Sequence, residues 1–213
     1  MTEKLYYKDA FLKEFEATVL SCSEKDGHYE ILLDKTAFFP EGGGQAGDAG
    51  YIGNAEIYDT KEHGGEIRHL SNSAVNYGET VCCRLDFEKR LERMQCHSGE
   101  HIVSGFFHRL YGLNNVGFHL GDTDVTVDLD GVLEEADIRK VERLANETIA
   151  KDIPIRAFFP SECEASKMEY RSKLEISEGL RLVEIPGVDL CACCAPHVAS
   201  TGQIGQIKLL DYA

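Results

Sequence analysis

Two short segments, far apart in the chain, constrain this sequence more than any other feature. The first places His97 and His101 four positions apart within a stretch of helical periodicity. This spacing puts both imidazoles on one face of a helix, within reach of a single ion. The second segment offers Cys193 and His197. Imidazole and thiolate are ligands that Zn²⁺ prefers, so a fold that joins the two segments would create a four-ligand metal site.

The spacing of these residues matters more than their identity. A single histidine on a helix is more often a structural or surface residue than a ligand, but two matched spacings favour a metal over coincidence. The first motif is not that of a metalloprotease, because Ser98 follows the first histidine and Glu100 precedes the second. We expect Glu100 to be a surface charge. Cys191, Cys193 and Cys194 compete for the sulfur position, and one surplus thiol is expected to lie near the ion without binding it.

Length and cysteine usage predict the compartment. The 213 residues can form one large domain or two small ones with a proper core. The sequence has no apolar run long enough for a membrane span and no leader-like N-terminus, so we expect a soluble cytoplasmic protein with no membrane partner. The eight cysteines include the adjacent pairs Cys82-Cys83 and Cys193-Cys194. This arrangement favours thiols and metal ligation over disulfides.

The net charge of −15 argues against extensive contact with nucleic acid, because lysine and arginine supply most non-specific affinity for phosphates. An enzyme that touches only one end of a nucleic acid needs a local basic patch. Lys89, Arg90 and Arg93 could form one, as could Lys167, Arg171 and Lys173. Solvated helix faces are an equally good interpretation of each cluster.

The sequence predicts an α+β protein of two domains, with the boundary between residues 85 and 86. Short alternating runs in residues 1–85, with a hairpin signal at Asp26-Gly27, predict a small antiparallel β-barrel. Residues 86–213 mix helical and strand patterns and predict a two-layer α/β sandwich. Its expected helices are 87–110, 134–151 and 161–170, with Ser161 as a cap, and its expected strands are 116–120, 124–129, 155–159, 180–185 and a closing strand at 205–210.

Two local patterns suggest contact with a ligand. Gly42, Gly43 and Gly44 precede Gln45 in a loop that is neither a P-loop nor a Rossmann fingerprint. The loop could press against a substrate, but on the glycines alone a hairpin tip is the simpler interpretation. On the first helix, the face with the histidines also carries the small residues Ser104 and Gly105, which favours a pocket over a packed core.

Four motifs in the same order resemble the editing domain of alanyl-tRNA synthetase, and more closely the free-standing alanyl-tRNA editing proteins called AlaX, of the medium-length type with an N-terminal barrel. The resemblance covers nearly the whole chain. The motifs are Thr36–Gln45, His97-x-x-x-His101, Arg181–Ile185 with Asp189, and Cys193-x-x-x-His197 followed by Thr201–Gly205.

The resemblance implies a zinc-dependent hydrolase that deacylates mischarged tRNA(Ala) at its acceptor end, chiefly Ser-tRNA(Ala) and secondly Gly-tRNA(Ala). The family's metal ligands fall on His97, His101, Cys193 and His197. Its glycine-rich loop, which helps to recognise substrate, falls on Gly42, Gly43, Gly44 and Gln45. The departure is Cys194-Ala195-Pro196, where the family commonly has Gly-Gly-Thr between the cysteine and the histidine.

Several alternatives stay open. The chemistry needs an activated water, which a metal can supply, and a polar group that pairs with the seryl hydroxyl. Gln45 and His119 are candidates for catalysis, and Thr123 and Thr126 are further candidates for discrimination. Four protein ligands close a tetrahedral site, which also fits a non-catalytic, zinc-stabilised tRNA-binding module. The altered loop permits a deacylase for another misacylated tRNA.

Overall fold

The computed structural model describes residues 2–121, 124–172 and 179–210. The protein is α+β, as predicted, and divides into two compact units, Met1–Glu92 and Arg93–Ala213. The division falls within the long helix α1 (Phe87–Tyr111), seven residues beyond the predicted boundary. No helix in the part of the chain that the structure describes is long and apolar enough to span a membrane.

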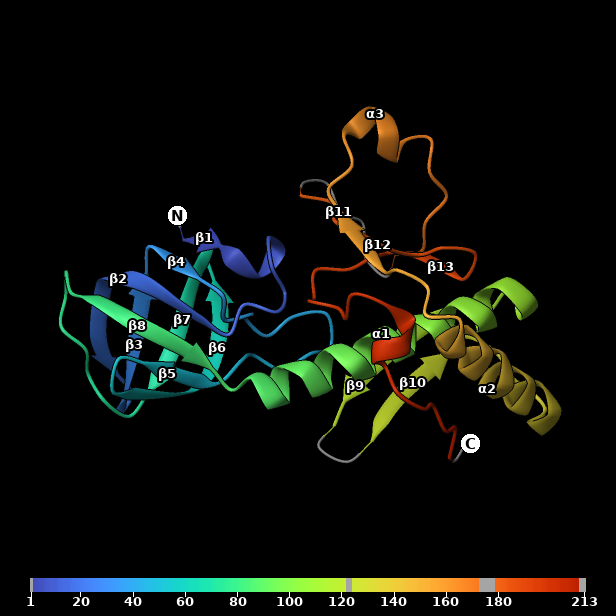
Figure 1. Ribbon diagram of the computed structural model, residues 1–213, viewed down its shortest axis with the longest axis horizontal. Coiled ribbons are helices and arrows are strands. Elements are labelled where there is room, and N and C mark those ends of the chain that lie inside the picture. Colours follow the sequence, from blue (N-terminus) through green and yellow to red (C-terminus); the bar gives the residue numbers. More distant parts are fainter. Residues whose placement is uncertain (1, 122–123, 173–178, 211–213) are drawn as a thin grey trace. The chain divides into compact units, whose positions relative to one another are not determined.

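Six antiparallel strands of the N-terminal unit form a sheet whose pairing order is closed, β2-β3-β7-β6-β5-β8, because β8 pairs again with β2 (Figure 1). The turn between β2 and β3 contains Asp26 and Gly27, both with positive φ, as expected for a two-residue hairpin. The strands of this unit are β1 (Glu3–Lys4), β2 (Glu14–Lys25), β3 (His28–Leu33), β4 (Lys35–Thr36), β5 (Gly50–Ile52), β6 (Ala55–His63), β7 (Glu66–Ser71) and β8 (Thr80–Leu85), with a short 3-10 helix at Leu5–Tyr7.

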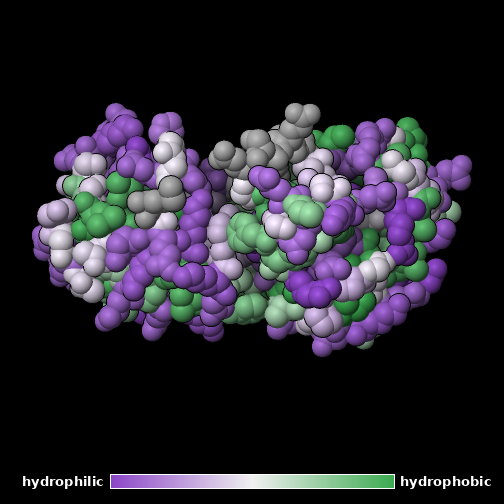
Figure 2. Space-filling view, turned by 90° about the horizontal axis from the view of Figure 1, so that it is seen from above, coloured by the Kyte–Doolittle hydropathy of each residue, from purple (hydrophilic) through white to green (hydrophobic). Residues whose placement is uncertain are grey.

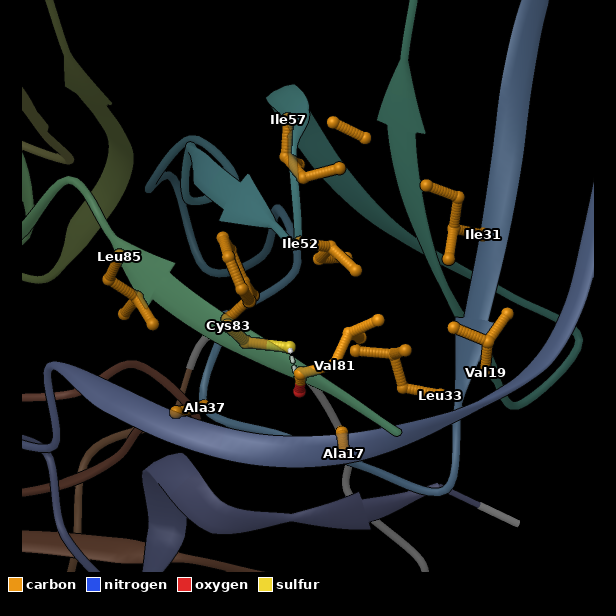
Figure 3. Close-up of a cluster of buried hydrophobic side chains, with 12 residues drawn as sticks. Ala17, Val19, Ile31, Leu33, Ala37, Ile52, Ile57, Val81, Cys83 and Leu85 are labelled. Atoms are coloured by element: carbon orange, nitrogen blue, oxygen red, sulfur yellow. Dashed lines mark hydrogen bonds between the residues drawn. The ribbon is translucent and has the colours of Figure 1, made fainter. Parts of the chain in front are cut away.

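The core of this unit lies inside the closed sheet. Alternate residues of the strands point inward, as the period of two along a strand requires, and their aliphatic side chains meet at the centre (Figure 3). Ala37, which follows β4, joins the same cluster. The largest aliphatic members, all buried, are Val19, Ile31, Leu33, Ile52, Ile57 and Leu85.

A buried histidine fixes the start of the glycine-rich segment. His69 on β7 is fully buried, and its Nδ1 lies 2.9 Å from the carbonyl oxygen of Ile31 while its Nε2 lies 2.8 Å from Thr36 Oγ1. Burial lowers the pKa of His69 to about 4, against the opposing hydrogen bond to Ile31. The ring is therefore neutral at pH 7, so Nδ1–H donates to Ile31 and Nε2 accepts from the Thr36 hydroxyl.

A buried ion pair connects the two ends of the same segment. Arg90 of α1 is completely buried and donates from Nε to Asp48 Oδ2 at 2.9 Å, from Nη2 to the Ala37 carbonyl at 2.6 Å and from Nη1 to the Ala10 carbonyl at 3.1 Å. Asp48 also accepts from the backbone N–H of Phe39. One guanidinium thus holds both ends of the segment that carries the three glycines. The sequence allowed a basic surface patch that includes Arg90. Because Arg90 is buried, it does not contribute to such a patch.

The C-terminal unit packs α1 against α2 (Glu135–Ala150). Four apolar residues of α1, Ile102, Val103, Phe106 and Phe107, form the core with Val141 and Ala145 of α2 and Ile185 of β12. Its strands form two separate antiparallel sheets within the described residues, β9–β10 and β11–β12–β13. The remaining elements are β9 (Asn115–Leu120), β10 (Val125–Leu129), β11 (Arg156–Phe158), α3 (Glu162–Ala165), β12 (Leu182–Ile185), β13 (Asp189–Ala192) and a 3-10 helix at Thr201–Gln203.

Most expected elements of this unit are present, with two differences in extent. Helix α3 is shorter than predicted, although Ser161 caps it as expected by accepting from the N–H of Glu164 at 3.3 Å. Strand β13 occupies residues 189–192, where the sequence predicted no strand. Its pairing with β12, residue Val183 opposite Cys191, overrides the weak local signal of that stretch.

The prediction of a closing strand at residues 205–210 is wrong. In place of a neighbouring strand, polar side chains of α2 bind the backbone of this segment. Asn146 Nδ2 donates to the carbonyl of Ile207 at 2.8 Å, and Asn146 Oδ1 accepts from its N–H at 3.0 Å. Glu142 accepts from the N–H of Leu209 at 2.8 Å. Because these groups satisfy the backbone, an alternating apolar pattern here packs against helices without joining a sheet.

We predict that acid weakens the N-terminal unit through His69. Its folded-state pKa lies below the unfolded value of about 6.5, so the unfolded chain binds a proton first as pH falls. The stabilisation is complete above pH 6.5 and is lost toward pH 4, amounting to about 2 kcal/mol between pH 7 and pH 5. Urea unfolding of the wild type and of His69→Gln at both pH values measures the difference. His63→Gln alters an exposed histidine of the same unit and should keep the wild-type dependence; an unchanged dependence in His69→Gln contradicts the prediction.

Candidate metal centre

The two predicted ligand segments meet in the C-terminal unit. The ligand atoms of His97, His101, Cys193 and His197 all lie within 4.8 Å of one another. Cys193 Sγ is 3.5 Å from His97 Nε2 and 3.4 Å from His197 Nε2, and the ring centroids of His101 and His197 are 4.7 Å apart. The three imidazoles are buried. Three nitrogens and one sulfur therefore converge on a volume the size of one ion.

A carboxylate fixes the orientation of His101. Its Nδ1 lies 3.0 Å from Asp189 Oδ2 on β13, so Nε2 is the nitrogen left to face the cluster. Arg171 holds the same carboxylate with two parallel hydrogen bonds, from Nε to Oδ1 and from Nη2 to Oδ2, each 2.8 Å. Such a partner behind a metal-binding imidazole sets its tautomer and raises its basicity. The sequence motif contained Asp189, but nothing in its spacing revealed Arg171.

His197 is oriented by the residue that follows His97. Ser98 is completely buried, its Oγ lies 3.0 Å from His197 Nδ1, and it accepts from the N–H of Val198 at 3.3 Å. The loop that carries Cys193 is held by Arg181, whose Nη1 donates to the carbonyls of Cys193 and Ala195 at 2.9 and 2.8 Å. Both residues select one geometry of the loop, and neither role follows from the sequence pattern.

The protonation states of Cys193 and His197 suit a metal. Burial alone would raise the pKa of the Cys193 thiol, but the imidazoles of His97 and His197 and hydrogen bonds from His101 and His197 outweigh it and hold that pKa well below its usual range. Burial lowers the pKa of His197 to about 3, against the opposing effect of Cys193, so this imidazole is neutral. A thiolate and a neutral imidazole are the forms in which these side chains bind metal ions.

The structure separates the three competing cysteines. Cys193 belongs to the four-residue cluster, Cys194 is exposed, and Cys191 is buried. Burial raises the pKa of Cys191 to about 11, despite the lowering effects of His101 and Arg171, so it remains a thiol. Its sulfur lies within 4.8 Å of ligand atoms of His101 and Asp189. A buried, protonated cysteine thus lies beside the cluster, as expected for one surplus thiol.

Glu100 is not the surface charge that the sequence suggested. Only 7% of it is exposed, and its carboxylate accepts from the hydroxyl of Ser104 and from Nδ2 of Asn115. Asn115 of β9 covers Glu100 on α1. The position of a charged residue on a helix therefore did not report its burial, because the covering strand comes from elsewhere in the chain.

The small residues of α1 do not open a pocket at the positions expected. A Cβ at Gly105 would lie 2.9 Å from Asp189 Cβ and from the carbonyl oxygen of Val188, so glycine is needed for close packing of α1 against the turn before β13. Ser104 is completely buried and bound to Glu100. The side chains on this face of α1 are small because the backbone at Val188 packs closely against it.

The glycine-rich segment belongs to the N-terminal unit. Gly42 and Gln45 exchange two backbone hydrogen bonds, of 3.0 and 3.1 Å, across Gly43 and Gly44, whose φ values are +61° and +83°. This is a two-residue hairpin turn, the simpler of the two interpretations. The Gln45 side chain is nonetheless buried, while both turn glycines are exposed. The local geometry of the turn therefore accounts for Gly43 and Gly44.

The other polar candidates lie on the hairpin β9–β10. His119 and Thr126 pair with each other across the two strands, and both side chains are exposed. Thr123 lies outside the described residues. The ring of Phe118, one residue earlier on β9, contacts that of His97, with centroids 4.8 Å apart and the ring planes tilted by 47°. Phe118 contacts the cluster, and no motif in the sequence pointed to it.

Comparison with known proteins identifies the family of this chain. Residues 180–212 match the family model described as the threonyl and alanyl tRNA synthetase second additional domain, and residues 2–89 match the model for class II (A) tRNA synthetases. The alanyl-tRNA editing protein AlaX-M of Saccharolobus solfataricus is 35% identical over 99% of this chain and 92% of its own length. This chain belongs to the AlaX family of alanyl-tRNA editing proteins.

Other relatives of this AlaX-family chain are longer. The AlaX-L protein of Pyrococcus horikoshii is 34% identical over the whole chain, and the alanine–tRNA ligase of Ignicoccus hospitalis is 32% identical over 99% of it. The chain spans 55% of the first protein and 24% of the second. The similarity to the ligase confirms the resemblance to alanyl-tRNA synthetase drawn from the motifs.

We predict that Asp189 is needed for tight metal binding. Asp189→Asn keeps the shape but removes the charge that orients His101, and partners of this kind typically contribute ~10- to 100-fold to metal affinity. Competition of the purified variant with a zinc chelator should show a loss of that size. Asp152→Asn is the matched control, because Asp152 binds the N–H of Gly202 at 3.0 Å and takes no part in the cluster. Equal zinc affinity in a folded Asp189→Asn variant contradicts the prediction.

Proposed function

We propose that this protein is a zinc-dependent trans-editing hydrolase that deacylates mischarged tRNA(Ala), chiefly Ser-tRNA(Ala) and secondly Gly-tRNA(Ala). The observation that carries the proposal is the convergence of three buried imidazoles and one thiol. It occurs in a member of a family whose curated relatives are named alanyl-tRNA editing proteins.

The donor set fits Zn²⁺. His97, His101, Cys193 and His197 are the proposed ligands, because nitrogen and thiolate donors at this spacing are those that zinc selects. When bound, the metal supplies a Lewis acid and lowers the pKa of water toward about 7. Asp189 and Ser98 hold His101 and His197 in fixed orientations, and the ring of Phe118 contacts that of His97. The buried surroundings limit solvent around the reacting ester.

The proposed substrate contacts come from the N-terminal unit. Gly42, Gly43, Gly44 and Gln45 would meet the aminoacyl end of the tRNA, with the exposed glycine turn as the approachable backbone. Between the two catalytic candidates we favour Gln45, since its side chain is buried in an organised segment. His119 is exposed on a hairpin edge.

The partner we propose is the acceptor end of tRNA(Ala), and the proposed location is the cytoplasm. Hydrophilic residues cover much of the face in Figure 2, and the net charge is −15. An acidic protein of this kind suits a short contact at one end of the tRNA better than a long one along its backbone. We further propose that residues 1–85 are the family's small barrel domain and that residues 86–213 are its two-layer editing domain.

Two alternatives rest on the number of ligands and on the loop between Cys193 and His197. All four side chains face the cluster together, and a closed four-ligand site is typical of structural zinc, which supports a non-catalytic tRNA-binding module. Cys194-Ala195-Pro196 supports a deacylase for a different misacylated tRNA, since proline removes a backbone donor from this loop.

We predict that zinc-loaded protein hydrolyses Ser-tRNA(Ala) and spares Ala-tRNA(Ala) by at least ~100-fold in kcat/KM, because a site that binds the seryl hydroxyl leaves a polar group unpaired with alanine. A deacylation assay with Ser-, Gly- and Ala-tRNA(Ala) and with Ser-tRNA(Ser) measures this. Binding of tRNA without turnover of any substrate supports the non-catalytic module. Preferred hydrolysis outside tRNA(Ala) supports the third function. Either result contradicts the proposal.

We predict that His101→Ala abolishes stoichiometric zinc, because it removes one of four donors and leaves Asp189 facing an empty position. Elemental analysis of the purified variant measures the metal content. His119→Ala removes an exposed histidine of the same unit and should retain zinc. Near-stoichiometric zinc in His101→Ala refutes the ligand assignment.

A further inference from the structure

Arg171 is committed to a buried partner in a way that the sequence did not suggest. The sequence allowed this residue as part of a basic surface patch. In the structure only 13% of its side chain is exposed, and two parallel hydrogen bonds of 2.8 Å join it to Asp189, from Nε to Oδ1 and from Nη2 to Oδ2. A guanidinium paired in this way adds little to a surface field for phosphates, so its function lies inside the unit.

The backbone of Arg171 fixes the point from which its side chain starts. Its N–H donates to the carbonyl of Leu190 at 2.9 Å, and its carbonyl accepts from the N–H of Ala192 at 2.8 Å. These bonds form a parallel bridge between Arg171 and Cys191 of β13. Because they do not involve the side chain, they remain when the side chain is replaced.

The Asp189 carboxylate lies between Arg171 and helix α1. Only 2% of the Asp189 side chain is exposed, and its Oδ2 also lies 3.0 Å from His101 Nδ1. A Cβ at Gly105 would lie 3.3 Å from Asp189 Cγ, so the backbone of α1 packs against the carboxylate. Packing therefore fixes the position of Cγ, while the hydrogen bonds decide how the two oxygens are turned.

The two bonds from Arg171 fix the torsion that packing leaves free. Rotation of an aspartate carboxylate about χ2 has broad minima, and a single hydrogen bond from His101 restricts it weakly. Two parallel N–H···O bonds from a planar guanidinium define the plane of the carboxylate. Oδ2 then stays where His101 Nδ1 can donate to it, and His101 Nε2 stays turned toward the cluster.

Net stability does not account for this ion pair. Taking two charges out of water costs about as much as their attraction returns, so apolar residues can often replace a buried pair without loss of stability. Arg171 and Asp189 are both largely buried, and one of their shared oxygens faces a proposed metal ligand. A role in the geometry of that ligand explains why charges are placed here.

We propose that Arg171 is a positioning residue of the metal centre, which acts through Asp189 to hold His101 in the orientation that binds the ion. The inference rests on the ligand assignment of the proposed function and adds a residue outside the four ligands. Arg171 has two opposing effects on Asp189. Its charge reduces the negative charge available to His101, and its two bonds align the carboxylate. We expect alignment to dominate, because a misaligned carboxylate cannot strengthen a hydrogen bond that it does not form.

Arg171→Lys separates the two effects, because lysine keeps the charge but lacks the planar pair of donors. Competition with a zinc chelator should show a roughly tenfold loss of zinc affinity, the low end of what partners behind a ligand contribute. Arg156→Lys is the matched control. Arg156 pairs with Glu184 at 2.7 Å in the same unit, its side chain is 65% exposed, and its replacement should leave zinc affinity unchanged.

A double-mutant cycle tests whether Arg171 acts through Asp189. In an Asp189→Asn background, Arg171→Lys should cost no further zinc affinity, because the carboxylate that it aligns is already gone. The absorption spectrum of the cobalt(II)-substituted protein reports ligand geometry, and both single variants should shift it in the same way. Thermal unfolding confirms that each variant is folded. Wild-type zinc affinity in Arg171→Lys, or equal losses in the two backgrounds, overturns the inference.

Arg171→Ala gives a second measurement that does not depend on the lysine variant. It removes the guanidinium beside a cavity of about 250 Å³ that Arg171 borders, so a small cation can reach Asp189. Free guanidinium, far below the concentration that unfolds proteins, should restore zinc affinity. Ammonium at the same concentration supplies the charge without the paired donors and should restore less. Equal effects of the two cations, or no effect of either, overturn the inference.

These measurements distinguish the inference from the proposed function, because zinc affinity and the cobalt(II) spectrum require no tRNA. A protein that deacylates no tRNA, but shows the coupling between Arg171 and Asp189, refutes the enzyme and supports the role of Arg171. A protein that hydrolyses Ser-tRNA(Ala) and shows no coupling supports the enzyme and overturns the role of Arg171.

Discussion

A single buried carboxylate joins the parts of the C-terminal unit on which the metal centre depends. Asp189 begins β13, accepts from His101 on α1 and pairs with Arg171, whose own backbone bonds to Leu190 and Ala192 on the same strand. Burial raises the pKa of Asp189, but the hydrogen bonds from His101 and Arg171 outweigh it and keep the carboxylate ionised. Removing one partner of a buried pair typically destabilises a protein by ~3–5 kcal/mol. The geometry of His101 is thus tied to the packing of a strand against a helix.

The helices and the order of the metal-binding residues could be predicted from the sequence because both depend on local spacing. Helix α1 was predicted from its periodicity to within one residue, and the spacing of His97 and His101 follows from it. The partners of these residues could not be predicted in the same way. Arg171, Ser98 and Phe118 reach the cluster through contacts between segments distant in sequence, and no periodicity encodes those.

The failures have a common physical cause. Glu100 is polar and the 205–210 segment alternates, yet the first is buried and the second is not a strand. In both places a side chain from another element forms hydrogen bonds with a polar group. The local sequence pattern predicts that solvent or a neighbouring strand would bind that group. Asn115 forms these bonds with Glu100, and Asn146 forms them with the backbone of Ile207. Sequence patterns report which groups need partners, but the fold decides which partners they receive.

The two units prepare polar groups for function by the same means. In the N-terminal unit, Arg90 and His69 hold the segment around the glycine turn, so that Gly43 and Gly44 are exposed on a rigid base. In the C-terminal unit, Asp189 and Ser98 hold the imidazoles of His101 and His197 in fixed orientations. A fixed donor or acceptor binds a ligand without the entropy loss of ordering a mobile side chain. Buried ionic and polar networks that contribute little to net stability are therefore explained by the rigidity that they give to the groups they hold.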